Sequence, residues 1–334
     1  MTLSQKQIPF SLLDLVTITQ EGSVKEAIEN SCELAQFAEE KKYKRFWLAE
    51  HHAMPGIASA ATSLVMSYVA SATKEIRIGS GGIMLPNHSP LVIAEQFGTL
   101  AAMHPGRIDL GLGRAPGTDQ KTMLALRRDP RKVGDDFPLL LEELQNYFED
   151  NHEGVIAVPG RGENIPIWIL GSSDFGARLA GQLGLPFGFA SHFSPQNTEV
   201  ALHVYRTSFR PSVYLKEPYA MVCISAFAAD TSEQAHYVSS STHLQFLSII
   251  RGKPQRLQKP VDDIDEYWSP QEKFAVKHQL ASTIIGNKEE VHAGIDQLIE
   301  KTQINELMIY SNAYYLEDRL KTYDIIAQHP LFLK

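Results

Sequence analysis

Cysteine is scarce in this chain, since its 334 residues include only Cys32 and Cys223. The two lie far apart and outside any CxxC spacing, which excludes a disulfide framework and a zinc knuckle. Long apolar runs are also lacking. The longest, Ala220–Ala229, is well short of the roughly 18 residues that a membrane-spanning helix needs. Because the segment Met1–Phe10 is polar, we expect no export signal and no membrane partner. The sequence predicts a soluble protein of the reducing cytoplasm.

Charge of one sign does not accumulate either. The net charge is −8, without long runs of like charge, which argues against nucleic acid or an anionic membrane as a partner. Any anionic ligand must therefore meet a local site. Hydrophobic residues make up 43% of the chain and charged residues 21%, which is typical of a globular protein rather than of a disordered or fibrous one.

Strand-like and helix-like segments alternate along the whole chain, which indicates parallel βα units rather than a sandwich or a helix bundle. The predicted strands are Phe10–Val16, Arg45–Ala49, Ile76–Ile83, Ile108–Leu112, Ile167–Leu170, Phe187–Ala190, Ala220–Ala229 and Glu306–Tyr310. With a helix after each strand, the expected fold is α/β. It is a (β/α)8 TIM-like barrel with insertions that forms one domain over residues 1–334.

Apolar residues at helical spacing locate the helices. These are Val24–Lys41, Ala60–Thr73, Pro90–His104, Asp136–Tyr147, Ser173–Leu183, a helix after Pro195, Glu233–Gln245 and a last helix around Leu316–Tyr323. A small hairpin is expected at Gly154–Glu163. The main insertion, Arg251–Pro270 within about residues 246–276, is rich in charge and proline. It is either a mobile lid or a surface excursion without function.

In such barrels the active site lies at the C-terminal ends of the strands. Polar or glycine-rich segments follow the predicted strands here, namely Glu50-His51-His52, Gly79–Gly82, Gly113-Arg114, Gly171-Ser172-Ser173, a position near His192, and Ser311-Asn312. These segments are the candidates for a functional site.

The adjacent histidines His51 and His52 invite a metal interpretation. Successive strand residues point to opposite faces, however, so the two are not expected to share an ion. The chain also has no HxH or HExxH spacing, and we predict no metal site. One imidazole in the barrel mouth, with a free pKa of about 6.5, could exchange a proton with a bound ligand. The alternative is that Glu50 and one histidine merely pair at the strand end.

The segment 111–117 resembles a dinucleotide-binding loop, but Pro116 takes the place of the third glycine of GxGxxG. A Rossmann site is therefore excluded. The glycines still permit close approach of a ligand to the backbone, and Arg114 offers a forked, permanent positive charge for a phosphate or a ring. A surface salt bridge is the alternative role for Arg114.

Gly171-Ser172-Ser173 lies directly before a predicted helix. Free backbone N–H groups, two hydroxyl groups and the positive end of a helix dipole together suit a phosphate. Plain N-capping is the alternative, and the acidic Asp174 in the first turn favours it. A cation and a helix N-terminus on neighbouring strands nevertheless suggest a phosphorylated cofactor.

Glycine inside a strand is costly unless something needs the space. Gly81 and Gly82 in the third predicted strand would let a flat ring lie against the backbone, or allow a strained peptide there. A bulge or a packing requirement of the barrel is the alternative.

At these residues the chain resembles the bacterial luciferase-like, flavin-dependent monooxygenase family. The matching segments are FWLAEHH at 46–52, IGSGGIMLP at 78–86, GRIDLGLGR at 106–114 and PIWILGSS at 166–173, followed by a tail over 286–310. The four motifs occur in order, and together with the tail the resemblance covers nearly the whole chain. They are more similar to the single-gene bacterial branch than to the light-emitting pair.

The resemblance implies a TIM-like barrel with an insertion after the seventh strand, FMN bound at the strand C-termini, and a homodimer. It places the active-site histidine at His51, a non-proline cis peptide at Gly81-Gly82, and flavin contacts at Arg114, Gly171 and Ser172. Ser173 completes the predicted phosphate-binding turn.

Two positions depart from the light-emitting enzyme. Gly113 stands where its large subunit carries a reactive cysteine, and Gly171 stands where it has a glutamate that contacts the flavin. Aldehyde-driven light emission is therefore not expected.

The predicted function is that of an FMN-dependent oxidoreductase, a monooxygenase that uses reduced flavin and O₂ on an organic substrate. The site must exclude water so that activated oxygen reacts with the substrate. A separate flavin reductase is expected to supply the reduced flavin, since no nicotinamide fingerprint occurs. Three alternatives stay open: a flavin-binding protein without turnover, a deazaflavin (F420)-dependent dehydrogenase of the same superfamily, and a metal-dependent barrel hydrolase.

Overall fold

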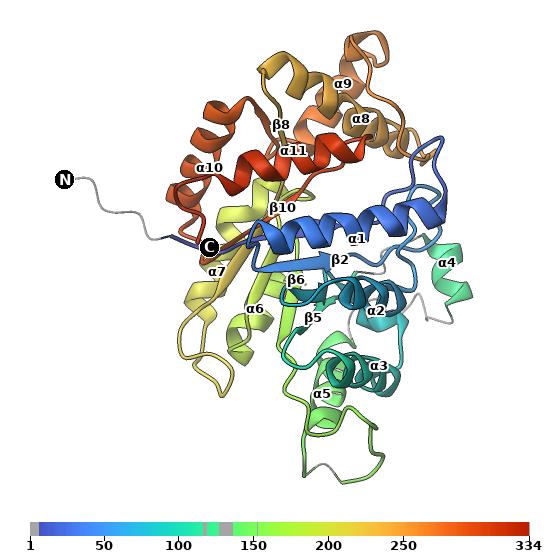
Figure 1. Ribbon diagram of the computed structural model, residues 1–334. Coiled ribbons are helices and arrows are strands. Elements are labelled where there is room, and N and C mark those ends of the chain that lie inside the picture. The colour runs from blue at the N-terminus through green and yellow to red at the C-terminus, as the bar shows by residue number, and fades with distance from the viewer. Residues whose placement is uncertain (1–6, 116–118, 127–135, 152, 334) are drawn as a thin grey trace, which may run out of the picture.

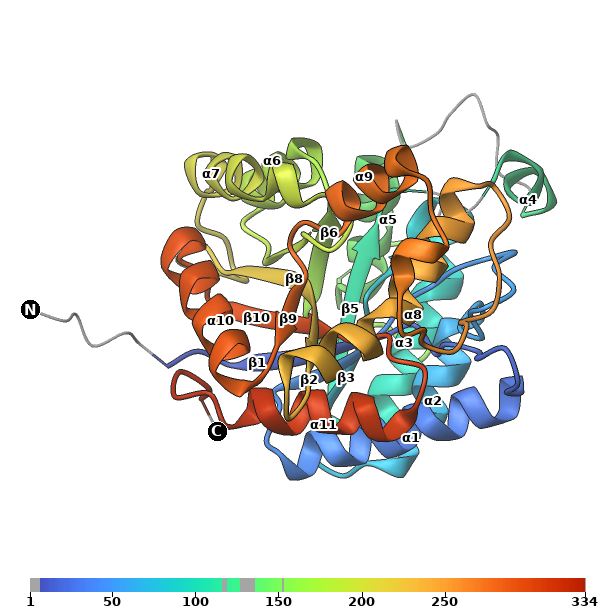
Figure 2. The same cartoon turned by 90° about the horizontal axis from the view of Figure 1, so that it is seen from above.

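Eight parallel strands form a closed barrel in the computed structural model, which describes residues 7–115, 119–126, 136–151 and 153–333. The strand order is β10-β1-β2-β3-β5-β6-β7-β8, and β8 pairs with β10 to close the wall. Helices surround the strands in both views (Figures 1 and 2). The predicted TIM-like barrel is confirmed.

The strand positions agree closely with those predicted. The barrel strands are β1 (Phe10–Asp14), β2 (Arg45–Leu48), β3 (Arg77–Ser80), β5 (Ile108–Gly113), β6 (Ile167–Gly171), β7 (Phe187–Ala190), β8 (Ala220–Ala228) and β10 (Glu306–Tyr310). The predicted strand Ile76–Ile83 is divided. Gly81 and Gly82 separate β3 from the short β4 (Ile83–Met84), because glycine weakens strand pairing. A further strand, β9 (Ile284–Gly286), pairs in parallel with the C-terminal part of β8.

All eight predicted helices are present, and the described residues form three more, at Gln120–Ala125, Pro270–Gln279 and Lys288–Thr302. The helices are α1 (Val24–Glu40), α2 (Thr62–Ala72), α3 (Pro90–Met103), α4 (Gln120–Ala125), α5 (Phe137–Phe148), α6 (Asp174–Leu183), α7 (Thr198–Ser208), α8 (Ser232–Ile250), α9 (Pro270–Gln279), α10 (Lys288–Thr302) and α11 (Leu316–Ala327). The Ser23 hydroxyl and the Glu26 carboxylate form a capping box that fixes the start of α1. None of the described helices combines the length and apolarity needed to cross a membrane.

The predicted hairpin is wrong. The segment Gly154–Glu163 contains turns and no strand, because Gly154 and Gly162 adopt positive φ angles and Pro159 has no amide hydrogen for strand pairing. Within the predicted insertion at about residues 246–276, α8 continues to Ile250 and α9 begins at Pro270, and the bounds of the insertion stay a prediction.

The insertion is attached to the barrel by backbone and side-chain contacts. The Leu257 N–H donates to the Ile18 carbonyl at 3.1 Å, and the Gln20 N–H donates to the Leu257 carbonyl at 2.7 Å. Leu247 and Trp268 belong to a separate small apolar cluster that joins α8 to the insertion. A role as a mobile lid stays a prediction.

A buried ion network forms the floor of the barrel at the N-terminal ends of its strands. Arg45 donates to Asp109 Oδ2 at 2.7 Å and forks onto both oxygens of Glu306 at 2.7 and 3.0 Å. Asp109 and Glu306 are fully buried, and Arg77 forms a second ion pair with Asp109. Burial alone would lower the pKa of Arg45, but Glu306 and Asp109 raise it above its usual value. The network links β2, β3, β5 and β10.

Replacing Arg45 by methionine is expected to lower the free energy of unfolding by about 3 to 5 kcal/mol, because it leaves Glu306 buried without its cation. Urea unfolding measures the loss. Lys25→Met, which removes an exposed ion pair with Glu29, is the control and should have little effect. Equal stability of the two variants would show that the floor network contributes nothing.

Candidate active site

A cavity of about 360 Å³ opens at the C-terminal ends of the barrel strands. Its walls are mostly apolar, with Leu13, Trp47, Met221, Cys223 and Met308 pointing inward from β1, β2, β8 and β10. The sequence-predicted site residues all line this one cavity: His51, Gly81, Gly82, Arg114, Gly171, Ser172 and Ser173. The structure thus brings the predicted residues together, while their roles stay predictions.

His51 lies in the wall of the cavity after β2. Its Nδ1 atom is buried and has no hydrogen-bond partner within the described part of the chain. Burial lowers the pKa of His51 to about 4, against an opposing effect of Glu50. The imidazole is therefore neutral near pH 7 and has a ring nitrogen available to a ligand.

Arg114 and the start of α6 face the same cavity. The Arg114 guanidinium carbon lies 4.1 Å from the centre of the Phe175 ring, in a cation–π contact. Ser173 is the N-cap residue of α6, but its side chain makes no capping hydrogen bond. The alternative of plain N-capping by this hydroxyl therefore does not hold. Pro116 and Gly117 of the neighbouring loop lie outside the described residues.

The Gly81-Gly82 peptide bond is cis, as the resemblance implied. Both residues also line the cavity, and their neighbours are close. A Cβ atom on Gly82 would lie 2.7 Å from the Gly111 carbonyl oxygen, and one on Gly81 would lie 2.6 Å from Leu13 Cδ1. Larger residues would displace the cavity wall, so the barrel-packing explanation for these glycines holds.

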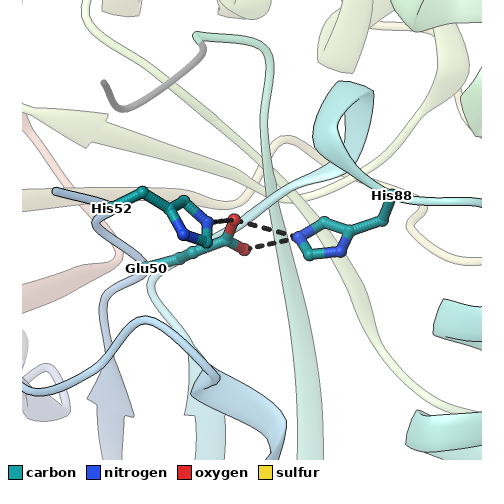
Figure 3. A group of neighbouring side chains, drawn as sticks. All are labelled: Glu50, His52 and His88. Carbon is teal, nitrogen blue, oxygen red and sulfur yellow. Dashed lines mark hydrogen bonds and ion pairs between the residues drawn. The ribbon is translucent and has the colours of Figure 1, made fainter. Parts of the chain in front are cut away.

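Glu50, His52 and His88 form a second cluster next to the cavity (Figure 3). The His52 and His88 rings approach the Glu50 carboxylate from two sides, with Nε2–oxygen distances of 2.7 and 2.9 Å. The Met84 N–H also donates to Glu50, at 3.0 Å. Burial would raise the pKa of Glu50, but its contacts with His52, His88 and Met84 lower it to about 2. From the sequence, one histidine was interpreted either as a group that exchanges a proton with a ligand or, more simply, as a partner of Glu50 at the strand end.

The ligand atoms of these three residues lie within 4.8 Å of one another, which is compatible with a metal ion. The same atoms also satisfy one another as hydrogen-bonded groups, because each imidazole faces a carboxylate oxygen. His51 is not part of this cluster, as expected, but both histidines lie beyond β2, which ends at Leu48, so strand alternation is not the reason.

His192 is the functional candidate to which sequence reasoning assigned no role. It follows β7, is 5% exposed and lines the cavity. Burial lowers its pKa to about 4. The inward alternation of Met221 and Cys223 on β8 was readable from a period of two residues, whereas nothing in the sequence indicated that the loop after β7 turns His192 inward.

The chain belongs to the luciferase-like monooxygenase family, whose model matches residues 8–306. It is 53% identical over 326 residues to the protein YvbT of Bacillus subtilis, and 48% identical over 325 residues to a luciferase-like monooxygenase of Escherichia coli. Each alignment covers 97% of both chains. An N-acetyl-S-alkylcysteine monooxygenase of Bacillus subtilis is 32% identical over 98% of this chain and 99% of its own.

Solved structures show the same fold. The crystal structure of apo-MsnO8 has a TM-score of 0.86 at 28% identity, over 96% of this chain and 98% of that one. The oxygenating constituent of 3,6-diketocamphane monooxygenase from Pseudomonas putida, in complex with FMN, has a TM-score of 0.75 at 17% identity, over 98% and 99%. An F420-dependent secondary alcohol dehydrogenase has a TM-score of 0.71 at 16% identity, over 98% and 100%.

The two neutral imidazoles give a testable pH dependence of stability. Unfolded histidines have a pKa of about 6.5, whereas burial in the folded protein lowers the pKa of His51 and of His192 to about 4. The unfolded chain therefore takes up protons that the folded chain rejects. Their contribution to stability is complete above about pH 6.5 and is lost as the pH falls toward 4.

In His192→Leu, the free energy of unfolding should decline less steeply as the pH falls, by about 1.4 kcal/mol per pH unit, because unfolding takes up one proton fewer. Urea unfolding over a series of pH values measures the slope. The control is His203→Leu, which removes an exposed imidazole from α7. Identical slopes in wild type and His192→Leu would contradict the expectation.

Proposed function

We propose that the protein is an FMN-dependent monooxygenase that uses reduced flavin and O₂ to oxidise a small organic substrate. A separate flavin reductase would supply the reduced FMN. The observation that supports this most is the apolar cavity in which Arg114, the uncapped start of α6 and His51 meet. Membership of the luciferase-like monooxygenase family supports the same chemistry.

The residues present fit a flavin. A phosphate group would be held between the Arg114 guanidinium and the backbone N–H groups at the start of α6, where the helix dipole adds positive potential. The apolar wall formed by Trp47, Met221 and Met308 suits a flat ring system. The buried and unpartnered Nδ1 of His51 is available to a polar ring atom.

Bound reduced flavin supplies two electrons, so that one oxygen atom of O₂ enters the substrate and the other leaves as water. The chain's own contribution is to bind, to orient and to exclude water. Because His51 is neutral at pH 7, it can accept a proton or share one at Nδ1 during the reaction. The apolar cavity wall keeps bulk water from the reacting atoms.

A deazaflavin-dependent dehydrogenase is the second candidate, favoured by the fold shared with the F420-dependent alcohol dehydrogenase. Absorbance titrations of the purified protein with FMN and with F420 separate the two. Tight binding of F420 alone would overturn the FMN proposal. FMN binding without O₂ consumption in the presence of reduced flavin would indicate a flavin-binding protein without turnover.

Arg114→Ala should weaken FMN binding by about tenfold or more, because a charge-assisted phosphate contact is lost. Flavin fluorescence titration measures the dissociation constant. Arg178→Ala is the control, since Arg178 lies on α6, whose start is part of the proposed phosphate site, but pairs with Asp174 at the surface. Equal affinity of wild type and Arg114→Ala would remove Arg114 from the phosphate site.

His51→Ala should change the rate at which bound reduced FMN is reoxidised by O₂. General acid–base contributions are typically worth about 10²- to 10⁴-fold. We expect faster reoxidation with release of hydrogen peroxide, followed by stopped-flow absorbance. His52→Ala should have the smaller effect, because His52 faces Glu50 instead of the cavity. Wild-type behaviour of His51→Ala with FMN still bound would make His51 part of the scaffold.

We also propose a homodimer that forms through α2 and α3, where large apolar side chains are exposed, namely Leu64, Tyr68, Val92 and Met103. Sedimentation at micromolar concentration should give twice the monomer mass of 37.3 kDa. Leu64→Glu should shift the protein toward the monomer, whereas Leu139→Glu on α5, which is equally exposed, should not. A monomeric wild type would rule the dimer out.

A cytoplasmic location stays a prediction, consistent with two free cysteines.

A further inference from the structure

His192 stands across the barrel mouth from His51. Four pairings separate β2 from β7 in each direction around the wall, through β3, β5 and β6 on one side and through β1, β10 and β8 on the other. Both imidazoles line the cavity, and besides burial the charged form of His51 contributes to lowering the pKa of His192. A ligand in the cavity therefore has a histidine on either side.

The hydrogen bonds of His192 define which ring nitrogen carries the proton. Nδ1 lies 3.4 Å from the Cys223 carbonyl oxygen, and the His192 backbone N–H donates to the same oxygen at 3.1 Å. A carbonyl oxygen only accepts, so Nδ1 must be the protonated nitrogen of the neutral ring. Nε2 then presents a lone pair.

That lone pair has no donor. Nε2 of His192 is buried and has no hydrogen-bond partner among the residues that the structure describes. Buried acceptors are nearly always satisfied in native proteins, so an unpaired one on a residue that lines a cavity indicates a missing ligand group or an ordered water. Protonation does not satisfy Nε2 near pH 7, because burial disfavours the imidazolium.

Contacts of the neighbouring residues Ser191 and Phe193 also hold the imidazole in place. The Ser282 hydroxyl donates to the Ser191 carbonyl at 2.9 Å, and Gln279 Nε2 donates to the Phe193 carbonyl at 2.5 Å. The Phe193 ring packs 4.3 Å from the His192 ring, centre to centre. These contacts tie the loop after β7 to the end of α9 and hold Nε2 in the cavity wall.

We propose that Nε2 of His192 accepts a hydrogen bond from an uncharged O–H or N–H group of the molecule bound in the cavity. The inference rests on the proposed function, because it assigns a second binding residue to the same site. The donor belongs either to the flavin ring or to the substrate. Ligand groups that only accept, such as a ketone or thioether, do not satisfy this position.

NMR of ¹⁵N-histidine-labelled protein tests the proposal directly. In the free protein, Nε2 of His192 should show the shift of an unprotonated nitrogen, and the His192→Gln variant identifies its signal. Addition of FMN should move the signal upfield if the flavin is the donor. If the substrate is the donor, the signal should move only when cyclohexanol is added to the FMN-bound protein, whereas cyclohexanone should have no effect.

Binding measurements on variants give an independent readout. If the flavin is the donor, His192→Leu should weaken FMN binding by about five- to tenfold. His192→Gln, which retains a side-chain acceptor, should restore most of the affinity. His243→Leu is the control, since His243 is a half-buried imidazole that likewise has an unpartnered ring nitrogen in the described chain, here Nδ1, but it packs on Trp268 instead of in the cavity. If the substrate is the donor, His192→Leu should abolish a preference for cyclohexanol over cyclohexanone.

The outcomes separate this inference from the proposed function. Failure of the wild type to bind FMN would overturn the proposed function. FMN binding with an unchanged Nε2 signal in every arm, or a proton on Nε2 in the free protein, would overturn the role of His192 alone. An unchanged signal would then assign the buried nitrogen to an ordered water.

Discussion

The fork of Arg45 between Asp109 and Glu306 is the interaction on which the rest of the barrel depends. It joins strands that are distant in sequence, at a depth where an unpaired charge is costly. Trp47 connects this floor to the site above it. Its indole N–H donates to Asp109 at 3.2 Å, and its ring forms part of the cavity wall. The bottom of the cavity is thus positioned by the ion network below.

The polar groups of the cavity are set by the same contrast between a charged floor and an apolar mouth. The floor carboxylates Asp109 and Glu306 are paired with arginine, whereas burial keeps the imidazoles of His51 and His192 neutral. The permanent charge of Arg114 lies at the edge of the site, against Phe175. Such an arrangement places charge where an anionic group can reach it and leaves uncharged nitrogens near the centre.

Close packing at three glycines and the position of one helix start shape the site. Gly81, Gly82 and Gly111 allow strands and side chains to approach so closely that a Cβ atom at any of these positions would overlap a neighbour. The close approach brings β3, β5 and β6 together. The N-terminus of α6 follows β6 directly, so it lies at the cavity rim and not at a distance from it.

The sequence by itself determined the barrel and the set of candidate residues. Apolar segments of strand length, helical spacing between them and polar residues at the strand ends are local patterns, and parallel strands carry those ends to one side of a barrel. The sequence also predicted that His51 and His52 serve different sites, although both lie beyond the end of β2 at Leu48 and strand alternation is not the cause. Local signals failed where proline and glycine turned the chain at residues 154–163, and where α8 ran past its predicted end.

Only the tertiary structure decided which polar groups meet. His88 reaches Glu50 from a loop 38 residues further along the chain, and His192 is neutral because it is buried, with Nε2 as its acceptor because the Cys223 carbonyl faces Nδ1. Neither contact has a pattern of spacing in the sequence. A protonation state depends on burial and on partners in space, and both arise only when the strands have closed the barrel.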